Sequence, residues 1–371
     1  MQLPPFRLER YFAKYEFTTE FLLSSSDCEA MTIAELLALE EGSQAKFQET
    51  WLGYTDSRGS LPLREAISAL YQAIEPENVL VHTGAEEAIF LFMHALLRPE
   101  DHVIVHWPCY QSLLQVASSI GCELSLWVAN EENEWALDLK ALRALIRPET
   151  RLIVINTPHN PTGFLMPAAD FRALGEIANE HHITLFSDEV YRGSEYEAAA
   201  QLPAACDLAE SAVSLGVTSK TYGLAGLRIG WIATRDRELI GRMAGLKDYT
   251  SICNSAPSEY LAALALRQRN KLVDRNLDII KSNLDVMEGF FARHSDQFRW
   301  VRPRAGSMAY PHLIQGDVDG FCDRLVHTAG VLLVPGSVYA DETAHFRLGL
   351  GRKNLPKAIE RLESFLDLDS A

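Results

Sequence analysis

The chain has 371 residues, of which 47% are hydrophobic and 23% are charged, and its formal net charge is −16. This length suits two domains better than one, and the balance of apolar and charged residues is typical of a folded globular protein. The acidic surplus argues against a nucleic-acid partner, because binding to phosphates requires a basic face. No apolar run is long enough to span a bilayer, so no membrane partner is expected.

The cysteines and the first residues of the chain bear on its compartment. The six cysteines form no C-x-x-C pair and show no metal-ligand spacing, so we expect reduced thiols and no metal site. The first ten residues carry Arg7, Glu9 and Arg10, and no apolar signal-peptide segment follows them. Together these features predict a cytoplasmic protein.

Apolar patterning predicts an α/β fold class. A helix is expected over 32–41. From about residue 60 to 280, short apolar runs alternate with longer amphipathic stretches. The runs predict strands at 79–81, 103–105, 152–155, 183–186 and 212–216, and the stretches predict helices at 86–97, 111–120 and 168–180. Continuous β-branched runs between helices indicate a mostly parallel sheet flanked by helices on both faces.

The two ends of the chain have a different pattern. After residue 280 we expect a helix at 285–293, a strand at 331–334 and a final helix at 355–366, and 198–200 is expected to be a loop. We therefore predict a large domain over 46–280 and a smaller α+β domain assembled from 1–45 and 281–371.

The most informative segment runs from Ser219 to Gly230. It places Lys220 after a small polar run and Arg228 eight residues later, among glycines. A lysine is a useful nucleophile only when it is held in place and partly neutral. A Schiff base between Lys220 and an aldehyde cofactor, with Arg228 holding the cofactor's phosphate, would explain the pattern. The alternative is a surface lysine beside a loop arginine.

Two loops that follow predicted strands carry further candidates. Gly84, Ala85 and Glu86 lie where a strand gives way to a helix, and free N–H groups at a helix start favour an anion. Asn160 lies in the string Asn156-Thr157-Pro158-His159-Asn160-Pro161-Thr162-Gly163 and could donate to a phenolate oxygen. The alternatives are an ordinary helix start and a common Pro/Asn turn.

Two charged residues need partners if they are buried. Asp188 ends a predicted buried strand, where a carboxylate requires a cation such as a protonated pyridine nitrogen. Arg347 lies on an apolar strand, where its planar guanidinium suits a carboxylate. Alternatively, Asp188 caps a helix beside a packed Tyr191, and Arg347 faces water.

Taken in this order, the motifs resemble the class I/II aminotransferases, which are fold type I enzymes dependent on pyridoxal 5′-phosphate (PLP). The resemblance extends from Tyr54 to Arg347 and implies a role for each matching residue. Lys220 would form the internal aldimine and move the proton at the substrate's α-carbon. Asp188 would pair with the pyridinium nitrogen, and Asn160 and Tyr191 would bind the 3′-oxygen.

The resemblance also implies the rest of the site. Tyr110 would stack on the cofactor ring, and the phosphate would be held by Gly84, Ala85, Glu86, Ser219 and Arg228. Arg347, with Asn160, would bind the substrate's α-carboxylate. Tyr54 would reach the cofactor of a partner subunit, which implies a homodimer. Val217 occupies a position where many relatives have serine, so the phosphate contact could fall to Thr218 or Ser219.

The expected activity is that of an aminotransferase acting on an α-amino acid and a 2-oxo acid through a quinonoid intermediate. A lyase or cyclase of the same fold is the alternative. The segments 8–12, 24–26 and 247–250 resemble a narrower group, the capreomycidine synthases. A non-catalytic PLP-binding regulator is a remote third reading, disfavoured by the net charge of −16 and the short segment before the first motif. Substrate choice could fall to Tyr11, Asp27, Tyr249 or Ser251.

Overall fold

A seven-stranded sheet organises the protein, whose computed structural model describes residues 3–369. Its strand order is β1-β7-β6-β5-β4-β2-β3. β7 is antiparallel to β1 and to β6, whereas the other neighbouring strands are parallel. The predicted α/β class with a mostly parallel sheet is therefore confirmed. The strands are β1 (Val79–His82), β2 (His102–Trp107), β3 (Glu123–Val128), β4 (Thr150–Asn156), β5 (Thr184–Asp188), β6 (Ala212–Val217) and β7 (Gly230–Thr234).

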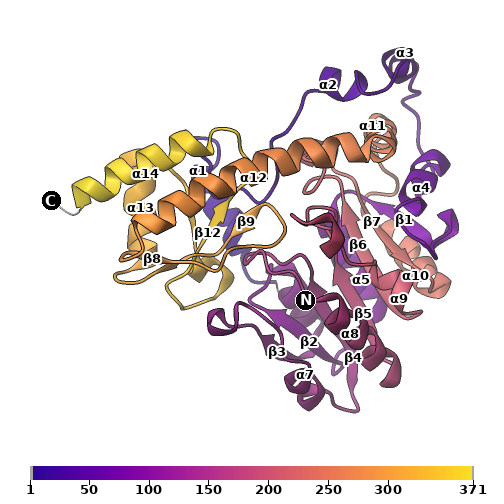
Figure 1. Cartoon of the computed structure of the whole chain (residues 1–371). Coiled ribbons are helices and arrows are strands. Elements are labelled where there is room, and N and C mark those ends of the chain that lie inside the picture. The colour runs from indigo at the N-terminus through magenta and orange to yellow at the C-terminus, as the bar shows by residue number, and fades with distance from the viewer. Residues whose placement is uncertain (1–2, 370–371) are drawn as a thin grey trace.

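Helices cover the sheet and continue into the C-terminal part of the chain (Figure 1). Those before residue 150 are α1 (Arg7–Tyr15), α2 (Ile33–Leu37), α3 (Ser43–Gln48), α4 (Leu61–Ser68), α5 (Ala85–Leu96), α6 (Ser112–Ile120) and α7 (Leu139–Leu145). The later ones are α8 (Ala168–Glu180), α9 (Ala205–Leu208), α10 (Arg237–Lys247), α11 (Ala256–Arg267), α12 (Arg269–Arg293), α13 (Val318–Ala329) and α14 (Leu355–Asp369).

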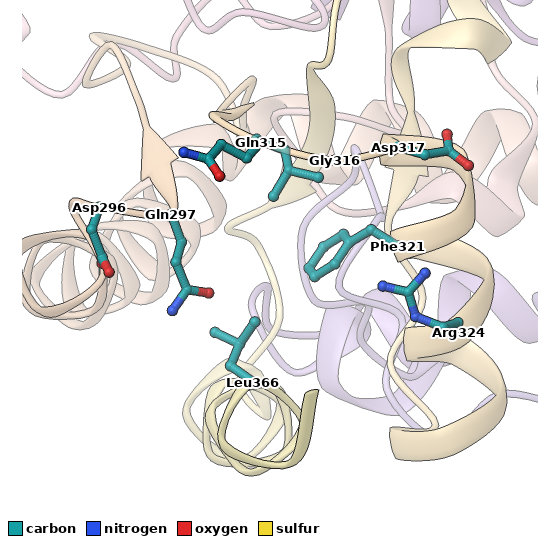
Figure 2. A pocket seen from close by; sticks show the side chains of 9 residues that line it. Asp296, Gln297, Gln315, Gly316, Asp317, Phe321, Arg324 and Leu366 are labelled. Atoms are coloured by element: carbon teal, nitrogen blue, oxygen red, sulfur yellow. The ribbon is translucent and has the colours of Figure 1, made fainter. Parts of the chain in front are cut away.

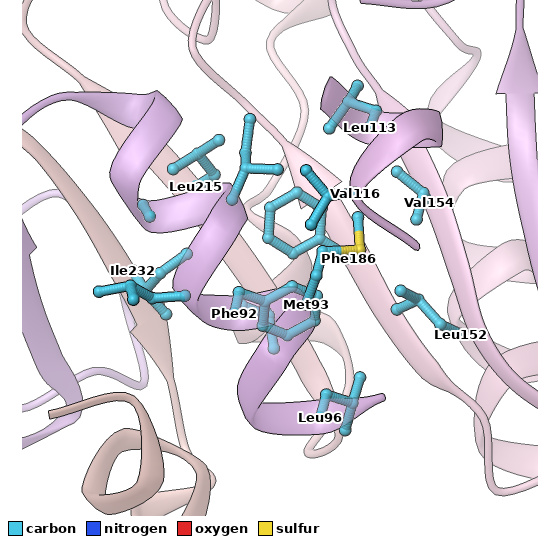
Figure 3. Close-up of a cluster of buried hydrophobic side chains, with 14 of the residues drawn as sticks. Phe92, Met93, Leu96, Leu113, Val116, Leu152, Val154, Phe186, Leu215 and Ile232 are labelled. Atoms are coloured by element: carbon cyan, nitrogen blue, oxygen red, sulfur yellow. The ribbon is translucent and has the colours of Figure 1, made fainter. Parts of the chain in front are cut away.

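Alternate residues of the central strands enter different cores. In β4, Leu152 and Val154 join the core under α5 and α6, whereas Ile153 and Ile155 join the core on the opposite face. This is the alternation of a strand that is buried on both faces. In the α5 core, the ring of Phe92 stacks on that of Phe186 with centroids 4.4 Å apart (Figure 3). The two covered faces fix the sheet, and hence the edge at which its parallel strands end.

The C-terminal part of the chain has small sheets and a core of its own. The strands are β8 (Phe298–Arg299), β9 (Met308–Ala309), β10 (His312–Leu313), β11 (Val334–Pro335) and β12 (Phe346–Gly349). Phe21 and Leu23, from the N-terminal segment, pack into the same core as α13 and α14. We propose on this basis that the two termini form the smaller domain. The proposed boundary at residue 280 falls inside α12, which runs unbroken for 25 residues (Figure 1).

Some predicted elements have other bounds. The helix expected over 32–41 is limited to Ile33–Leu37, and the helix expected over 285–293 is the end of α12. The strand expected over 331–334 is wrong except at its last residue, because Val331 makes only an isolated bridge with Phe21. A run of apolar residues indicates that a segment is buried, but it does not show whether the segment pairs with a neighbouring strand. Residues 198–200, which were expected to form a loop, form a short 3-10 helix. Several other elements, α1, β3 and β7 among them, were not predicted.

Two further features concern cysteines and membrane spans. None of the six cysteines forms a disulfide, and four of them are buried. Among residues 3–369, no helix has the length and apolar character needed to cross a bilayer.

Replacing Phe92 by alanine should lower the free energy of unfolding by about 3–5 kcal/mol, because it removes a fully buried ring and leaves a cavity. Urea denaturation of the two proteins measures the difference. Val128→Ala on the edge strand, where the side chain is 47% exposed, is the control and should cost less than about 1 kcal/mol. Equal effects of the two substitutions would contradict this account of the core.

Candidate active site

A cavity of about 400 Å³ lies where β4, β5 and β6 end, beside the N-terminus of α5. Carboxyl ends of neighbouring parallel strands meet at one edge of a sheet, which is where ligands bind in such folds. Most of the residues predicted from the sequence line this cavity. They are Ala85, Glu86, Tyr110, Asn160, Asp188, Tyr191, Ser219, Lys220 and Arg228.

Asp188 is a buried carboxylate at the end of β5. Its Oδ1 accepts a hydrogen bond from the Val190 backbone N–H at 3.2 Å, and it forms no ion pair among the described residues. Burial raises the pKa of Asp188 to about 7, although the Val190 hydrogen bond and the charge of Lys220 lower it. The carboxylate therefore lacks a close cation, and a cationic ligand would stabilise its charged form.

Lys220 follows β6 and points into the same cavity. Its Nζ donates to the Ser26 hydroxyl at 2.9 Å. The pKa of Lys220 is lowered, chiefly by burial; Arg347 acts in the same direction, whereas Asp27 and Asp188 oppose it. A lowered pKa leaves a larger fraction of the amine neutral, which is the form that can attack an aldehyde.

The N-terminus of α5 and Arg228 form a cradle for an anion. Gly84 precedes the helix with φ 85°, and no side chain caps the first N–H groups. A Cβ on Gly84 would lie 2.5 Å from Nη2 of Arg228, and a Cβ on Gly230 would lie 2.6 Å from the Gly84 carbonyl carbon. The start of α5 therefore lies close to Arg228 at Gly84 and close to the start of β7 at Gly230. Exposed N–H groups beside a guanidinium suit a phosphate.

Glu86 brings a carboxyl group to the cavity wall near this cradle. The Ser112 hydroxyl donates a short hydrogen bond to it. Burial raises the pKa of Glu86, while Ser112 and Tyr110 lower it by hydrogen bonding. A raised pKa favours the neutral form, which would repel a neighbouring anion less than a carboxylate would.

The structure separates the two hydroxyls that follow Val217. The Thr218 hydroxyl donates to the Ile229 backbone carbonyl at 3.1 Å, and Thr218 does not line the cavity. Ser219 does line it. Ser219 is therefore better placed than Thr218 to contact an anion held by Arg228.

Arg347, from β12, is fully buried and reaches the cavity through Asn160. Its Nη1 donates to Asn160 Oδ1 at 3.3 Å and, by a short bond, to the Tyr339 hydroxyl. Its Nε and Nη2 both donate to the Ser24 carbonyl, at 3.1 and 2.8 Å. No carboxylate within residues 3–369 forms an ion pair with Arg347. A buried guanidinium with this set of neutral partners can accept the carboxylate of a ligand.

Asn160 and Asp188 are held together by Asn156. The Asn156 side chain donates to the Asp188 backbone carbonyl at 2.9 Å and accepts from the Asn160 N–H at 2.7 Å. Because Asn160 Oδ1 accepts from Arg347 and Tyr339, its Nδ2 amide is the group left to donate to a ligand. The Tyr191 hydroxyl is buried and makes no hydrogen bond of ordinary geometry in the described chain, although Ser26 is close enough to affect its pKa.

Tyr110 forms one wall of the cavity, in the loop after β2. Its ring lies 5.2 Å from that of Phe6. The backbone carbonyl of Pro108, two residues earlier, accepts a hydrogen bond from His159 Nε2 at 2.8 Å. Burial lowers the pKa of His159 to about 3, so this ring is neutral. The contact fixes the Tyr110 loop to the Asn160 loop.

Tyr54 lies away from this chain's own cavity and is 85% exposed. Of the four residues considered for substrate choice, Asp27 lines the cavity, whereas Tyr11, Tyr249 and Ser251 do not. The sequence reading missed Glu9 and Glu16, which line the cavity from α1 and its C-terminal cap. Leu8, Glu9, Phe12 and Glu16 are spaced as on one face of a helix, a pattern that could have revealed them.

The described part of the chain has other cavities. One lies among the ends of α12, α13 and α14, with Gln297, Phe321 and Leu366 in its wall (Figure 2). It contains neither lysine nor a residue of the Lys220 cavity. Among residues 3–369, no group of histidine, cysteine, aspartate and glutamate side chains could hold a metal ion.

The residues of the Lys220 cavity fit PLP. Asp188 needs a cation, which the pyridinium nitrogen provides, and the α5 cradle needs an anion, which the phosphate provides. The Lys220 amine, with its lowered pKa, suits the aldehyde, and the Tyr191 hydroxyl is free to bind the ring oxygen. The sheet with these groups at its carboxyl edge is that of a PLP-dependent enzyme.

Comparisons with known proteins define the family. Residues 19–362 match aminotransferase class I and II. The chain is 31% identical over 355 residues to capreomycidine synthase of Streptomyces vinaceus, covering 94% of this chain and 89% of that protein. It superposes with a TM-score of 0.93 on a PLP-dependent aminotransferase of Streptococcus suis, at 33% identity over 99% of this chain and 98% of the other. The PLP-dependent cyclase OrfR gives a TM-score of 0.92, at 27% identity over 100% and 98%.

The chain belongs to the class I and II aminotransferase family. It is a PLP-dependent enzyme, and the family implies an amino acid and a 2-oxo acid as its substrates.

The pKa of Asp188 predicts a pH dependence for the cofactor-free protein. A carboxyl whose pKa rises from 3.8 to about 7 on folding stabilises the fold below its ordinary pKa and loses that contribution as the pH rises through 7. The wild type should therefore lose on the order of 3 kcal/mol relative to Asp188→Asn between pH 5 and pH 8. Denaturant titrations of both proteins at the two pH values measure this difference. The exposed Asp278→Asn variant should follow the wild type, and a pH-independent difference for Asp188→Asn would contradict the assignment.

Proposed function

We propose that Lys220 carries the cofactor and transfers the proton in an amino-group transfer from an α-amino acid to a 2-oxo acid. The observation that carries this proposal is a lysine amine with a lowered pKa in a cavity that also holds an unpaired Asp188. When bound, PLP supplies an electron sink for the negative charge left on the substrate's α-carbon.

The neighbouring residues support this role by binding and orientation. Asp188 would hold the pyridinium nitrogen protonated, and Asn160 and Tyr191 would donate to the ring oxygen. Gly84, Ala85, Glu86, Ser219 and Arg228 would hold the phosphate through backbone N–H groups, a hydroxyl and a guanidinium. Tyr110 would pack against the ring face. With the cofactor fixed at both ends, the ring cannot slide away from the Lys220 amine.

Arg347 is proposed to bind the substrate's α-carboxylate, assisted by Asn160. The two side chains are 3.3 Å apart, so one carboxylate could contact both. Such an anchor would place the α-carbon proton near the Lys220 amine, which would take that proton as a general base and return it to the cofactor side. Lys220 must be neutral for this step, in keeping with its lowered pKa.

A lyase or cyclase reaction at the same residues is the second candidate. The likeness to capreomycidine synthase and to the cyclase OrfR favours it, and a PLP-dependent aminotransferase is equally similar in structure. Both candidates begin with removal of the α-carbon proton. They differ in the fate of the cofactor, which changes to its amine form only in an amino-group transfer.

We further propose that the active unit is a homodimer in which Tyr54 reaches the partner subunit's cavity. Trp51, Leu52, Tyr54 and Tyr249 are between 77% and 91% exposed. Their two segments adjoin, because Lys247 Nζ donates to the Ser57 carbonyl at 2.5 Å. An apolar surface of this kind is typical of an interface between subunits. Tyr54 is exposed and its loop is held by the Lys247 hydrogen bond, which supports the proposal that Tyr54 contacts the cavity of a second copy of the chain.

The fate of the cofactor separates the two candidate functions. Adding a suitable amino acid to the PLP-loaded enzyme should shift the cofactor's absorbance to that of the pyridoxamine form and release about one equivalent of 2-oxo acid per site. Absorbance and oxo-acid assays measure the two changes, and a later addition of 2-oxo acid should restore the PLP spectrum. Product formation with a cofactor that remains PLP after turnover would instead identify a lyase or cyclase.

Hybrid dimers test whether Tyr54 acts in the partner subunit's cavity. Lys220→Ala and Tyr54→Ala homodimers should each be impaired, but a hybrid of the two contains one site with both native residues. Unfolding and refolding an equal mixture should therefore give about a quarter of the wild-type sites with native cofactor affinity and activity. Each homodimer treated alone is the control. If the refolded mixture has no more activity than the mean of the two homodimers, Tyr54 does not act across the interface.

A further inference from the structure

We propose that Glu9 and Glu16, on helix α1, form a subsite for a positively charged side chain of the amino-acid substrate. The proposal rests on the proposed function, because it assigns a substrate class to the Lys220 cavity. A guanidinium or an ammonium group at the end of an aliphatic side chain would satisfy this chemistry.

Helix α1 forms a wall of the cavity. Leu8, Glu9, Phe12 and Glu16 line the cavity at spacings that place them on one face of the helix. Two apolar side chains therefore flank two carboxylates, which suits a ligand with an aliphatic stem and a charged end.

A neighbouring face of α1 is fixed to the rest of the protein. The Tyr11 hydroxyl donates to the Leu333 carbonyl at 2.8 Å, and the Tyr15 hydroxyl donates to Asp323 at 3.0 Å. Arg7 also donates to the Ser337 carbonyl at 3.2 Å. These bonds set the rotation of α1 about its axis, so its two glutamates are held toward the cavity rather than carried on a loose tail.

The other charges of the cavity have partners or assigned ligands. Asp27 pairs with Arg352 at 2.8 Å, and Glu86 is bonded by Ser112. Under the proposed function, Arg228 would bind the phosphate of the cofactor and Asp188 its ring nitrogen. Lys220 and Arg347 are used at the aldehyde and the α-carboxylate under the proposed function.

Glu9 and Glu16 are the charges that remain. Neither forms a salt bridge or a side-chain hydrogen bond among residues 3–369. The pKa of the half-buried Glu16 is raised by burial and by the charges of Glu9 and Asp27, which Arg352 and Lys220 only partly offset. Carboxylates crowded in this way are stabilised by a cation placed between them and destabilised by an added anion.

The subsite therefore predicts an order of substrates. An amino acid with a cationic side chain should bind more tightly than a neutral one of the same shape, and one with an acidic side chain should bind most weakly. The charged end of the substrate side chain would contact Glu9 and Glu16 at the mouth of the cavity, and the substrate's α-carboxylate would lie deeper, at Arg347.

Arginine and citrulline provide the direct test, because they have nearly the same shape and differ in charge. Calorimetric titration of the PLP-loaded enzyme should give at least about tenfold tighter binding of arginine than of citrulline. Glu16→Gln and Glu9→Gln should each reduce this ratio severalfold, and the double variant should bring it near one. Glu20→Gln, an exposed glutamate that does not line the cavity, is the matched control and should keep the wild-type ratio.

Two results separate the inference from the function on which it rests. Equal binding of arginine and citrulline, or a ratio unchanged in the double variant, would overturn the cation subsite even if amino-group transfer occurs. An arginine preference that depends on the two glutamates, without a change of the cofactor to its amine form, would support the subsite and count against the amino-group transfer.

Discussion

The structure depends on the placement of buried charges that do not neutralise one another. Asp188, Lys220 and Arg347 meet at one edge of the sheet, and none of them forms an ion pair within the described residues. Burying charge in this way is unfavourable, and the shifted pKa values of Asp188 and Lys220 record that cost. A ligand with a cationic ring nitrogen and an anionic phosphate would relieve that cost.

The protein can hold these buried charges in place because the surrounding strands and helices are firmly packed. Strands buried on both faces deliver Asn156, Asp188 and Val217 to the same edge, and Asn156 links the first two strands' loops by hydrogen bonds. The cores under α5 and on the opposite face hold these strands in register. Rigid elements therefore position the charges, and the loops add the groups that contact the ligand.

Much of this could be predicted from local sequence. Apolar runs located the central strands. Asp188 lies at the end of one strand, and Asn160 and Lys220 lie in loops that follow two others, so the three residues converge at one edge of the sheet. What could not be predicted depends on contacts between distant segments. The partner of Val331 is Phe21, more than three hundred residues earlier, and the choice between Thr218 and Ser219 follows from a single carbonyl, that of Ile229. The spacing of Glu9 and Glu16 could have indicated a helical face, but that this face lines the cavity depends on how α1 packs against distant segments.

The central claim is that the amine of Lys220, kept partly neutral by burial, binds the cofactor covalently. The most direct test is borohydride reduction of the PLP-loaded protein, followed by proteolysis and mass spectrometry. The account predicts a single reduced phosphopyridoxyl group on the peptide that contains Lys220. A label on Lys247, a buried lysine whose pKa is also lowered, or no label on Lys220, would contradict it.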